Sequence, residues 1–316
     1  MKILGLQLCT ILIWVNGFTQ INDSIIPTTQ YKTLPVFVVN DSFKTSRFIE
    51  YIKQDSSFYK SFKQLHLLNY SAINDIRMMD NQNACVASLH SKTQQVRSNG
   101  CRMMKTISEE ITGDFFDDQR EYNYYTAKLY ASLFFTKGKV CNETNVVQKA
   151  NINPKEKSGI EKHKDQLKQL FFNPGKQITG IPFMRNKTAI YDESLLKYYN
   201  NNISTETKNG VNCIVFNQQV KQENSKRVVV QEMKTWFDEM TMQIVARDYE
   251  LVSDAGVYDF NVKMEVSMIK IGEYYVPNLI RYVGDWKYVF KKRERGVFTI
   301  TFFDFKAPIP NPSPER

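Results

Sequence analysis

The sequence predicts an α+β protein in which a curved antiparallel meander sheet, like an incomplete barrel, fills the carboxyl-terminal half and is covered by helices from the amino-terminal half. One observation is a segment of about fourteen residues, Tyr258 to Ile271, that alternates apolar and polar side chains, whereas a typical strand has five or six residues. A second is the series of strand-like segments after Asn209, separated by turns so short that neighbouring strands must be antiparallel. A third is the helical spacing of apolar residues earlier in the chain.

The amino terminus has the pattern of a secretory leader. Lys2 precedes an apolar run from Ile3 to Val15, which is too short to span a bilayer and is followed by small residues. We expect residues 1–19 to be a signal peptide cleaved after Thr19, with cleavage after Gly17 or an uncleaved anchor as alternatives. No later run approaches eighteen apolar residues, so we expect an exported chain that is periplasmic, outer-membrane-associated or secreted, and not an integral membrane protein.

Loss of this leader would remove Cys9 and leave an even number of cysteines in an oxidising compartment. We expect Cys101 to pair with Cys141, because each follows a turn that contains glycine, SNGC and KGKVC. Closing so long a loop contributes about 4 kcal/mol. Buried free thiols are the alternative.

The formal net charge of +9 is spread over all 316 residues and serves mainly solubility. One dense basic cluster lies between Lys287 and Arg295, where we expect a charged hairpin tip. Export argues against a nucleic acid as the partner.

Four regions follow from these patterns. Residues 1–19 are the expected signal peptide, and residues 20–158 are expected to be a mixed helical and irregular region. Residues 159–306 are expected to be a helix followed by the curved antiparallel sheet. Residues 307–316 form a Pro-rich tail that we expect to be flexible.

In the second region, Leu34 to Val39 predicts a short strand and Ser42 to Leu68 predicts one or two helices. The stretch from Ala84 to Ser91 predicts a strand. The segment Glu121 to Gly138 is compatible with an aromatic-rich strand, but its Ala, Lys and Leu content favours a helix that ends before Gly138. Residues 142–158 are polar without periodicity, which indicates a loop.

The third region begins with an amphipathic helix, Gly159 to Phe172, which the Asn-Pro-Gly sequence at residues 173–175 should end. We expect this helix to pack on the sheet, and a role as a cover over a cavity is the alternative. A short helix is expected from Glu193 to Tyr199. The predicted strands are Val211 to Asn217, Arg227 to Phe237, Gln243 to Val252, Val257 to Ile271, Tyr274 to Val283, Trp286 to Lys292 and Val297 to Lys306.

The last strands carry apolar and aromatic residues on both faces, which is more than a one-sided sheet needs. Either both faces are covered, or a curved sheet encloses an apolar cavity. The candidates for lining such a cavity are Tyr258, Phe260, Val262, Met264, Val266, Met268, Trp286, Phe290, Phe298 and Phe302. Aromatic and Met side chains suit flexible apolar ligands, and they are also ordinary core residues.

Over about the last eighty residues, the residues at the starts of successive predicted strands resemble those of the periplasmic outer-membrane lipoprotein carriers and their lipoprotein-sorting relatives. The matching features are Trp236, Asp238 and Thr241 at one strand, the long strand after it, and Gly272, Val276, Pro277 and Ile280 at the next. The resemblance implies an incomplete antiparallel barrel whose apolar concave side is covered by helices and binds acyl chains. The first 140 exported residues depart from the carrier layout. The Lys-, Asn-, Tyr- and Phe-rich composition, with a leader ending in Thr-Gln, is also similar to exported proteins of Bacteroidota.

No catalytic residue, metal site or cofactor is expected. The three histidines, His66, His90 and His163, are far apart in the sequence, and the chain lacks the usual hydrolase, phosphate-loop and dinucleotide motifs. The acidic cluster GDFFDD at residues 113–118 lacks the spacing of a calcium loop and is expected to be a solvated turn.

The function that we expect is non-catalytic binding of an apolar ligand, a lipid or an acylated protein, in the concave side of the sheet. The alternative is a periplasmic or surface interaction module without a cavity, whose partner is an outer-membrane or envelope protein. An enzyme is the third hypothesis and would require a cleft with two buried carboxylates.

Overall fold

The computed structural model describes residues 42–147, 168–178, 184, 186–254, 258–288 and 292–306. The expected signal peptide, the strand from Leu34 to Val39, the boundary at residue 158 and the Pro-rich tail lie outside the described residues, as does most of the helix predicted from Gly159. In the described ranges, no helix has the length and apolar character needed to cross a membrane.

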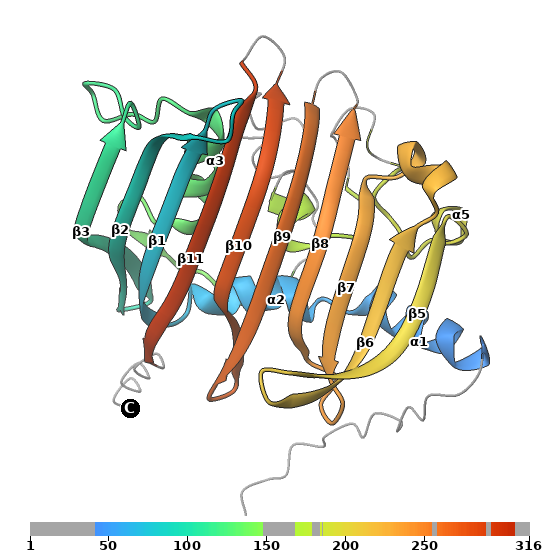
Figure 1. Ribbon diagram of the computed structural model, residues 1–316. Coiled ribbons are helices and arrows are strands. Elements are labelled where there is room, and N and C mark those ends of the chain that lie inside the picture. Colours follow the sequence, from blue (N-terminus) through green and yellow to red (C-terminus); the bar gives the residue numbers. More distant parts are fainter. Residues whose placement is uncertain are drawn as a thin grey trace, which may run out of the picture. The chain divides into compact units, whose positions relative to one another are not determined.

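One antiparallel sheet of eleven strands dominates the fold (Figure 1), and its order is β4-β3-β2-β1-β11-β10-β9-β8-β7-β6-β5. The strands are β1 Asn69–Met79, β2 Cys85–Ser98, β3 Cys101–Gly113, β4 Val140–Cys141, β5 Tyr199–Lys208, β6 Val211–Val220, β7 Val230–Asp238, β8 Ile244–Asp254, β9 Tyr258–Ile271, β10 Tyr274–Tyr288 and β11 Glu294–Lys306. The sheet is therefore an open pair of meanders, β1 to β4 and β5 to β11, joined where β1 pairs with β11. The predicted α+β class and antiparallel meander are confirmed.

The helices lie on one face of this sheet, and Figure 1 shows α1, α2 and α3 together behind it. They are α1 Ser42–Gln54, α2 Ser57–Leu65, α3 Tyr125–Phe134 and α5 Glu193–Leu196, with a 3₁₀ helix at Gln222–Arg227. Residues 168–172 are also helical. One or two helices were predicted from Ser42 to Leu68, and there are two. Between them, the Asp55 carboxylate accepts a hydrogen bond from the Ser57 amide at 3.1 Å.

The long strand β9 is a single element, as predicted. Its inward side chains, Phe260, Val262, Met264, Val266 and Met268, are all buried. The residues between them, such as Asn261, Lys263 and Glu265, are exposed. A strand with one buried and one solvated face produces this alternation.

The prediction that residues 20–158 are mixed helical and irregular is wrong for residues 69–113, because β1, β2 and β3 extend the sheet across them. The predicted strand from Ala84 to Ser91 is only the first part of β2. The edge strands β3 and β5 were missed because an edge strand with little packed against it does not show a clean apolar face.

The predicted break between the strands Tyr274 to Val283 and Trp286 to Lys292 is also wrong. β10 continues through Gly284 and Asp285 to Tyr288. Gly284 lies opposite Gly296 in β11. The Tyr282 and Phe298 rings stack with 4.8 Å between their centroids, and a Cβ at Gly284 would lie 1.9 Å from the Tyr282 hydroxyl. Glycine here makes room for aromatic rings inside a continuous strand.

The inner face of β6 to β11 is filled by aromatic side chains from the helices. Phe48 of α1 contacts Phe216 and Phe237, each with 5.5 Å between ring centroids. In α2, Phe62 stacks on Phe172 at 4.2 Å. These contacts make the helices and this part of the sheet one continuous core.

Candidate functional site

The predicted lining residues lie side by side on the inner face of β9, β10 and β11, but they pack against one another. Phe260, Val262, Met264, Val266, Met268, Trp286, Phe298 and Phe302 are each at most 5% exposed. Phe260 stacks on Trp286 at 4.6 Å, and Phe171, from the end of the helix predicted over Gly159 to Phe172, contacts Trp286 at 6.0 Å. The Tyr258 side chain and Phe290 lie outside the described parts, and the role of all ten residues in ligand binding remains a prediction.

The space left at this part of the core is small. A cavity of about 20 Å³ lies between α3, residues 171–172 and the strands, next to Met264 and Phe298. That volume suits about one water molecule. Within the described residues, this part of the inner face has no room for an acyl chain.

A much larger cavity lies at the other end of the same face. It measures about 690 Å³ and is enclosed by β2, β3, α3 and the segment that joins β3 to α3. Its apolar lining includes Leu89, Met104, Phe116, Leu129, Phe135 and Val140. The volume falls within the roughly 300–1,000 Å³ range of small-molecule sites.

The position of α3 explains why this end is hollow. The Glu294 carboxylate of β11 accepts hydrogen bonds from the amides of Tyr125 and Thr126, at 2.9 and 2.8 Å, and thereby caps the start of α3. The Tyr130 ring packs on Phe298, also in β11, at 4.7 Å. These contacts fix α3 over β11, and the inner faces of β2 and β3 remain apart from the helix.

The exposure of the lining residues shows where the cavity opens. Its floor is on β2, where Leu89, Ser91 and Thr93 are each at most 4% exposed. Its lining on β3 includes Thr106 and Glu109, which are exposed. The cavity therefore opens along β3.

A buried amide lies beneath this floor and holds two of its hydroxyls. Asn74 of β1 is fully buried, and its amide nitrogen donates to the Ser91 and Thr93 hydroxyls at 3.3 and 3.1 Å. Among the described residues, the Asn74 side-chain oxygen has no hydrogen-bond partner. A polar floor beneath apolar walls gives the cavity a few oriented groups within a mostly apolar lining.

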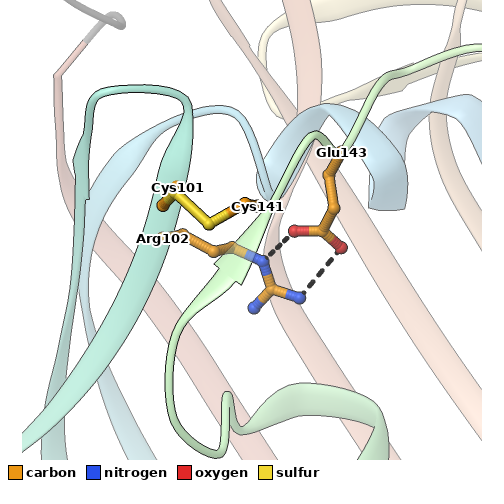
Figure 2. Close-up of a disulfide and its surroundings, with 4 residues drawn as sticks. All are labelled: Cys101, Arg102, Cys141 and Glu143. Atoms are coloured by element: carbon orange, nitrogen blue, oxygen red, sulfur yellow. Dashed lines mark hydrogen bonds and ion pairs between the residues drawn. A yellow bond between two sulfur atoms is a disulfide. The ribbon is translucent and has the colours of Figure 1, made fainter.

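The predicted disulfide between Cys101 and Cys141 is confirmed and stands at one end of this cavity (Figure 2). It joins the start of β3 to β4, so that Arg102 lies opposite Val140. The Arg102 guanidinium pairs with both carboxylate oxygens of Glu143, as Figure 2 shows, and also donates to Gln95 and Thr136. A buried arginine is stable here because its donors are satisfied.

The carboxylate of Glu143 is shared with His66, whose Nδ1 lies 3.1 Å from it. Burial alone would raise the pKa of Glu143, but hydrogen bonds from His66 and Arg102 outweigh burial and lower it to about 2. Burial lowers the pKa of His66, against the opposing effect of Glu143. Arg102 also borders a second cavity of about 240 Å³, which His66 and Glu143 line as well, so Arg102 lies between the two spaces.

The rim of the larger cavity carries exposed ion pairs. Arg120 pairs with Glu109, and Lys128 pairs with Glu121 at 2.9 Å. Exposed pairs of this kind contribute little to stability, because water screens them. They leave the rim polar and hydrated rather than closed.

In the ranges that the structure describes, no three His, Cys, Asp or Glu side chains gather in a way that could hold a metal ion. The acidic segment at residues 113–118 forms a turn in which Asp117 accepts hydrogen bonds from the amides of Gln119 and Glu121, at 3.0 and 2.8 Å. Of the basic residues expected at a hairpin tip, Arg293 bridges Asp259 and Asp285, and Arg295 also pairs with Asp285.

The residues that line the 690 Å³ cavity were not among the predicted site residues. Their only signal in the sequence was the aromatic segment from Glu121 to Gly138, which is now seen to form one wall as α3. Met104 and Thr106 carried no signal, because β3 was not recognised as a strand.

No protein-family model matches the chain, and no curated protein matches it either. Among solved structures, a DUF1329 family protein from Desulfovibrio piger is 9% identical, covers 84% of this chain and 95% of its own, and has a TM-score of 0.28. An outer membrane lipoprotein-sorting protein domain from Vibrio parahaemolyticus is 7% identical, covers 84% of this chain and 92% of its own, and has a TM-score of 0.27. The second neighbour is of the class that the last strands of the sequence resemble.

Proposed function

We propose that the chain is an exported, non-catalytic protein that binds the acyl chain of a lipid or of an acylated partner in the cavity between β2, β3 and α3. The observation that supports this function is the cavity of about 690 Å³ with apolar and aromatic walls, open along one strand. The site lies on the same face of the sheet as the predicted concave site, but at its opposite end.

The lining fits an apolar chain better than a polar metabolite. Met104 of β3, Leu129 of α3 and Phe135, which directly follows α3, all line the space. Met side chains adapt to flexible apolar ligands because they are unbranched and polarizable. The buried polar side chains of the floor are hydroxyls and an amide, and the charged side chains lie at the rim or are paired at the end wall.

The rest of the sheet serves as the scaffold of this site. The packed inner face of β6 to β11 anchors α3 through Glu294 and Phe298. A site supported by a rigid core keeps its shape when empty, which lowers the entropic cost of binding. Export rests on the leader-like residues 1–19.

The test is the binding of a fluorescent fatty acid to the purified chain, with palmitate as competitor. Thr106→Trp and Met104→Trp place a large ring in the cavity, and we expect each to weaken binding at least tenfold. Lys105→Trp is the matched control, because Lys105 lies between these residues on β3 with its side chain on the opposite face.

Near-equal affinity in all three variants and the parent chain would contradict this site. Native mass spectrometry of the purified chain gives an independent measure, since bound lipid should be present in the parent and depleted in Thr106→Trp. Circular dichroism checks that each variant is folded.

A further inference from the structure

The strand β3 leaves an edge of the sheet unpaired for most of its length (Figure 1). β4 pairs only with Cys101 and Arg102 of β3. From Met103 to Gly113, no strand of the described chain pairs with the outer edge of β3. The backbone N–H and C=O groups along that edge are therefore available to another strand.

The two outer ends of the sheet differ in the side chains that they expose. More than half of the exposed large apolar side chains of the described chain lie on β2 and β3, and these are Val86, Val96, Met103, Ile107 and Ile111. None of them lies on β5, the strand at the other end of the sheet. A cluster of exposed apolar side chains beside an unpaired edge indicates a surface that is covered by a partner.

The charges of β3 are ordered along the strand. Lys105 lies toward the end that pairs with β4, and Glu110 lies toward the opposite end. Both side chains are exposed, and neither has an ion-pair partner among the described residues. A strand with opposite charges toward its two ends is complementary to an antiparallel copy of itself.

The bulge in β3 places these two charges on one face. Residues 105 and 110 are an odd number of positions apart, so a regular strand would direct their side chains to opposite faces. The register with β2 shifts between Lys92 and Thr93, however, and Lys105 and Glu110 lie opposite Gln94 and His90. Since Gln94 and His90 share a face of β2, Lys105 and Glu110 share the outer face of β3.

The limits of the free edge determine the register of such a pair. When Met103 lies opposite Thr112 of a second copy, the pairing uses the free edge and stops where β4 begins. In that register, Lys105 of each copy lies opposite Glu110 of the other. The bulge falls at the centre of the pair, so the side chains that lie opposite each other on either side of it share a face.

We propose that β3 pairs antiparallel with β3 of a second copy of this chain, which gives a dimer with two-fold symmetry and one continuous sheet. A contact that uses the same surface on both copies closes on itself and therefore stops at two copies. Two pairs between Lys105 and Glu110 fix the register, and the exposed Met103 and Ile107 gain contacts. The inference concerns association of the chain with itself and does not depend on what the cavity binds.

The experiment is sedimentation velocity of the full chain over a range of concentrations, which gives the dissociation constant of the dimer. Lys105→Glu and Glu110→Lys each replace two attractive pairs by two repulsive ones, and we expect each to raise that constant at least tenfold. The double variant Lys105→Glu, Glu110→Lys should restore it to the value of the parent chain. Exposed pairs add little to the stability of a single copy, so these variants report on association rather than on folding.

A mixture of the two single variants tests the register directly. In a mixed dimer of Lys105→Glu with Glu110→Lys, every charge again faces its opposite, so the mixture should dimerise as tightly as the parent chain although each variant alone does not. Lys270→Glu and Glu273→Lys make the same changes of charge at the exposed end of β9 and the turn after it, and they should leave the dissociation constant unchanged.

Hydrogen exchange should show that dimerisation protects the amides of residues 103–112 and not those of β5. A chain that stays monomeric at every concentration would overturn the inference. It would also be overturned by a dimer that forms equally well in Lys105→Glu, or by single variants that fail to associate when mixed. Long assemblies in which the β5 amides are protected too would mean that β3 pairs with β5 of the next copy, which excludes the two-fold dimer.

Discussion

The inner face of this sheet is packed under β9 to β11 and hollow beside β2 and β3, although helices cover both ends. At the packed end the inward side chains are large, such as Phe260 and Trp286, and residues 171–172 press onto them. At the hollow end the inward positions are small and polar, such as Ser91 and Thr93, and α3 directs Tyr130 toward β11 instead. Small inward residues on β2 and the attachment of α3 to β11 together leave this space.

The two ends therefore contribute differently to the free energy of folding. The packed end contributes free energy of folding, because it removes large apolar side chains from water. The hollow end forgoes part of that stabilisation, because the described side chains leave its space unfilled. Under the proposed function, a bound acyl chain would supply the missing contacts.

The largest expected difference between the two ends is in the free energy of unfolding, after one large side chain is truncated at each end. Phe260→Ala should lower the free energy of unfolding by about 3–5 kcal/mol, because it leaves a cavity in a close-packed core. Met104→Ala should cost about 1 kcal/mol or less, because its side chain already borders open space. Urea denaturation measures both, and equal losses would show that the hollow end is packed in solution.

Removal of the disulfide should have the next largest effect. The Cys101 to Cys141 bond closes a loop with a sequence separation of 40, and its loss should lower the free energy of unfolding by about 2–4 kcal/mol. The double variant Cys101→Ser, Cys141→Ser tests this by urea denaturation, with the exposed free cysteine variant Cys85→Ser as the control.

Hydrogen exchange then locates the effect of the disulfide. Exchange in β3 and β4 should accelerate more than exchange in β9, because β4 loses its covalent link to the edge of the sheet. Uniform acceleration across the sheet would contradict a division into two ends.

The smallest effect concerns pH at the end wall of the cavity. The folded-state pKa of Glu143, about 2, lies below the unfolded value of about 4.3. Its stabilising contribution is therefore complete above the unfolded value and is lost as pH falls through the folded value. Glu143→Gln should cost about 1–2 kcal/mol at pH 7, allowing for partial exposure, and the difference should narrow as pH is lowered from 5 toward 2.

The exposed residue Glu110 on β3 provides the matched control. Glu110→Gln should change stability little at either pH. A Glu143→Gln variant whose deficit is the same at pH 7 and pH 3 would contradict the pairing with Arg102 as the cause.

The sequence predicted two kinds of element well. These are strands in which only one face is buried, and segments that follow a recognisable glycine turn. β9 was recognised because every second residue is buried, and the disulfide because both cysteines follow glycine turns. β3 and β5 were missed because neither edge strand shows a regular alternation of one apolar and one polar face. Gly284 was misread because glycine usually marks a turn, and nothing local to it signals that two rings need its space.

The cavity could not be predicted, because it depends on contacts between distant parts of the chain. The side chain of Glu294 fixes α3 from 169 residues away in the sequence. Without that tether the same helix could pack onto β2 and β3 and fill the space. Local periodicity predicts a helix at α3 but not the strand to which it is attached.

The pairing of β1 with β11 has a consequence for how the chain reaches this fold. Asn74 lies opposite Ile300, so the contact joins residues 226 positions apart. Local hairpins form quickly, but contacts of such long range slow folding because a large loop must be closed first. Until β1 pairs with β11, each meander keeps an unpaired edge. This is the stage of folding at which the chain is most exposed to aggregation.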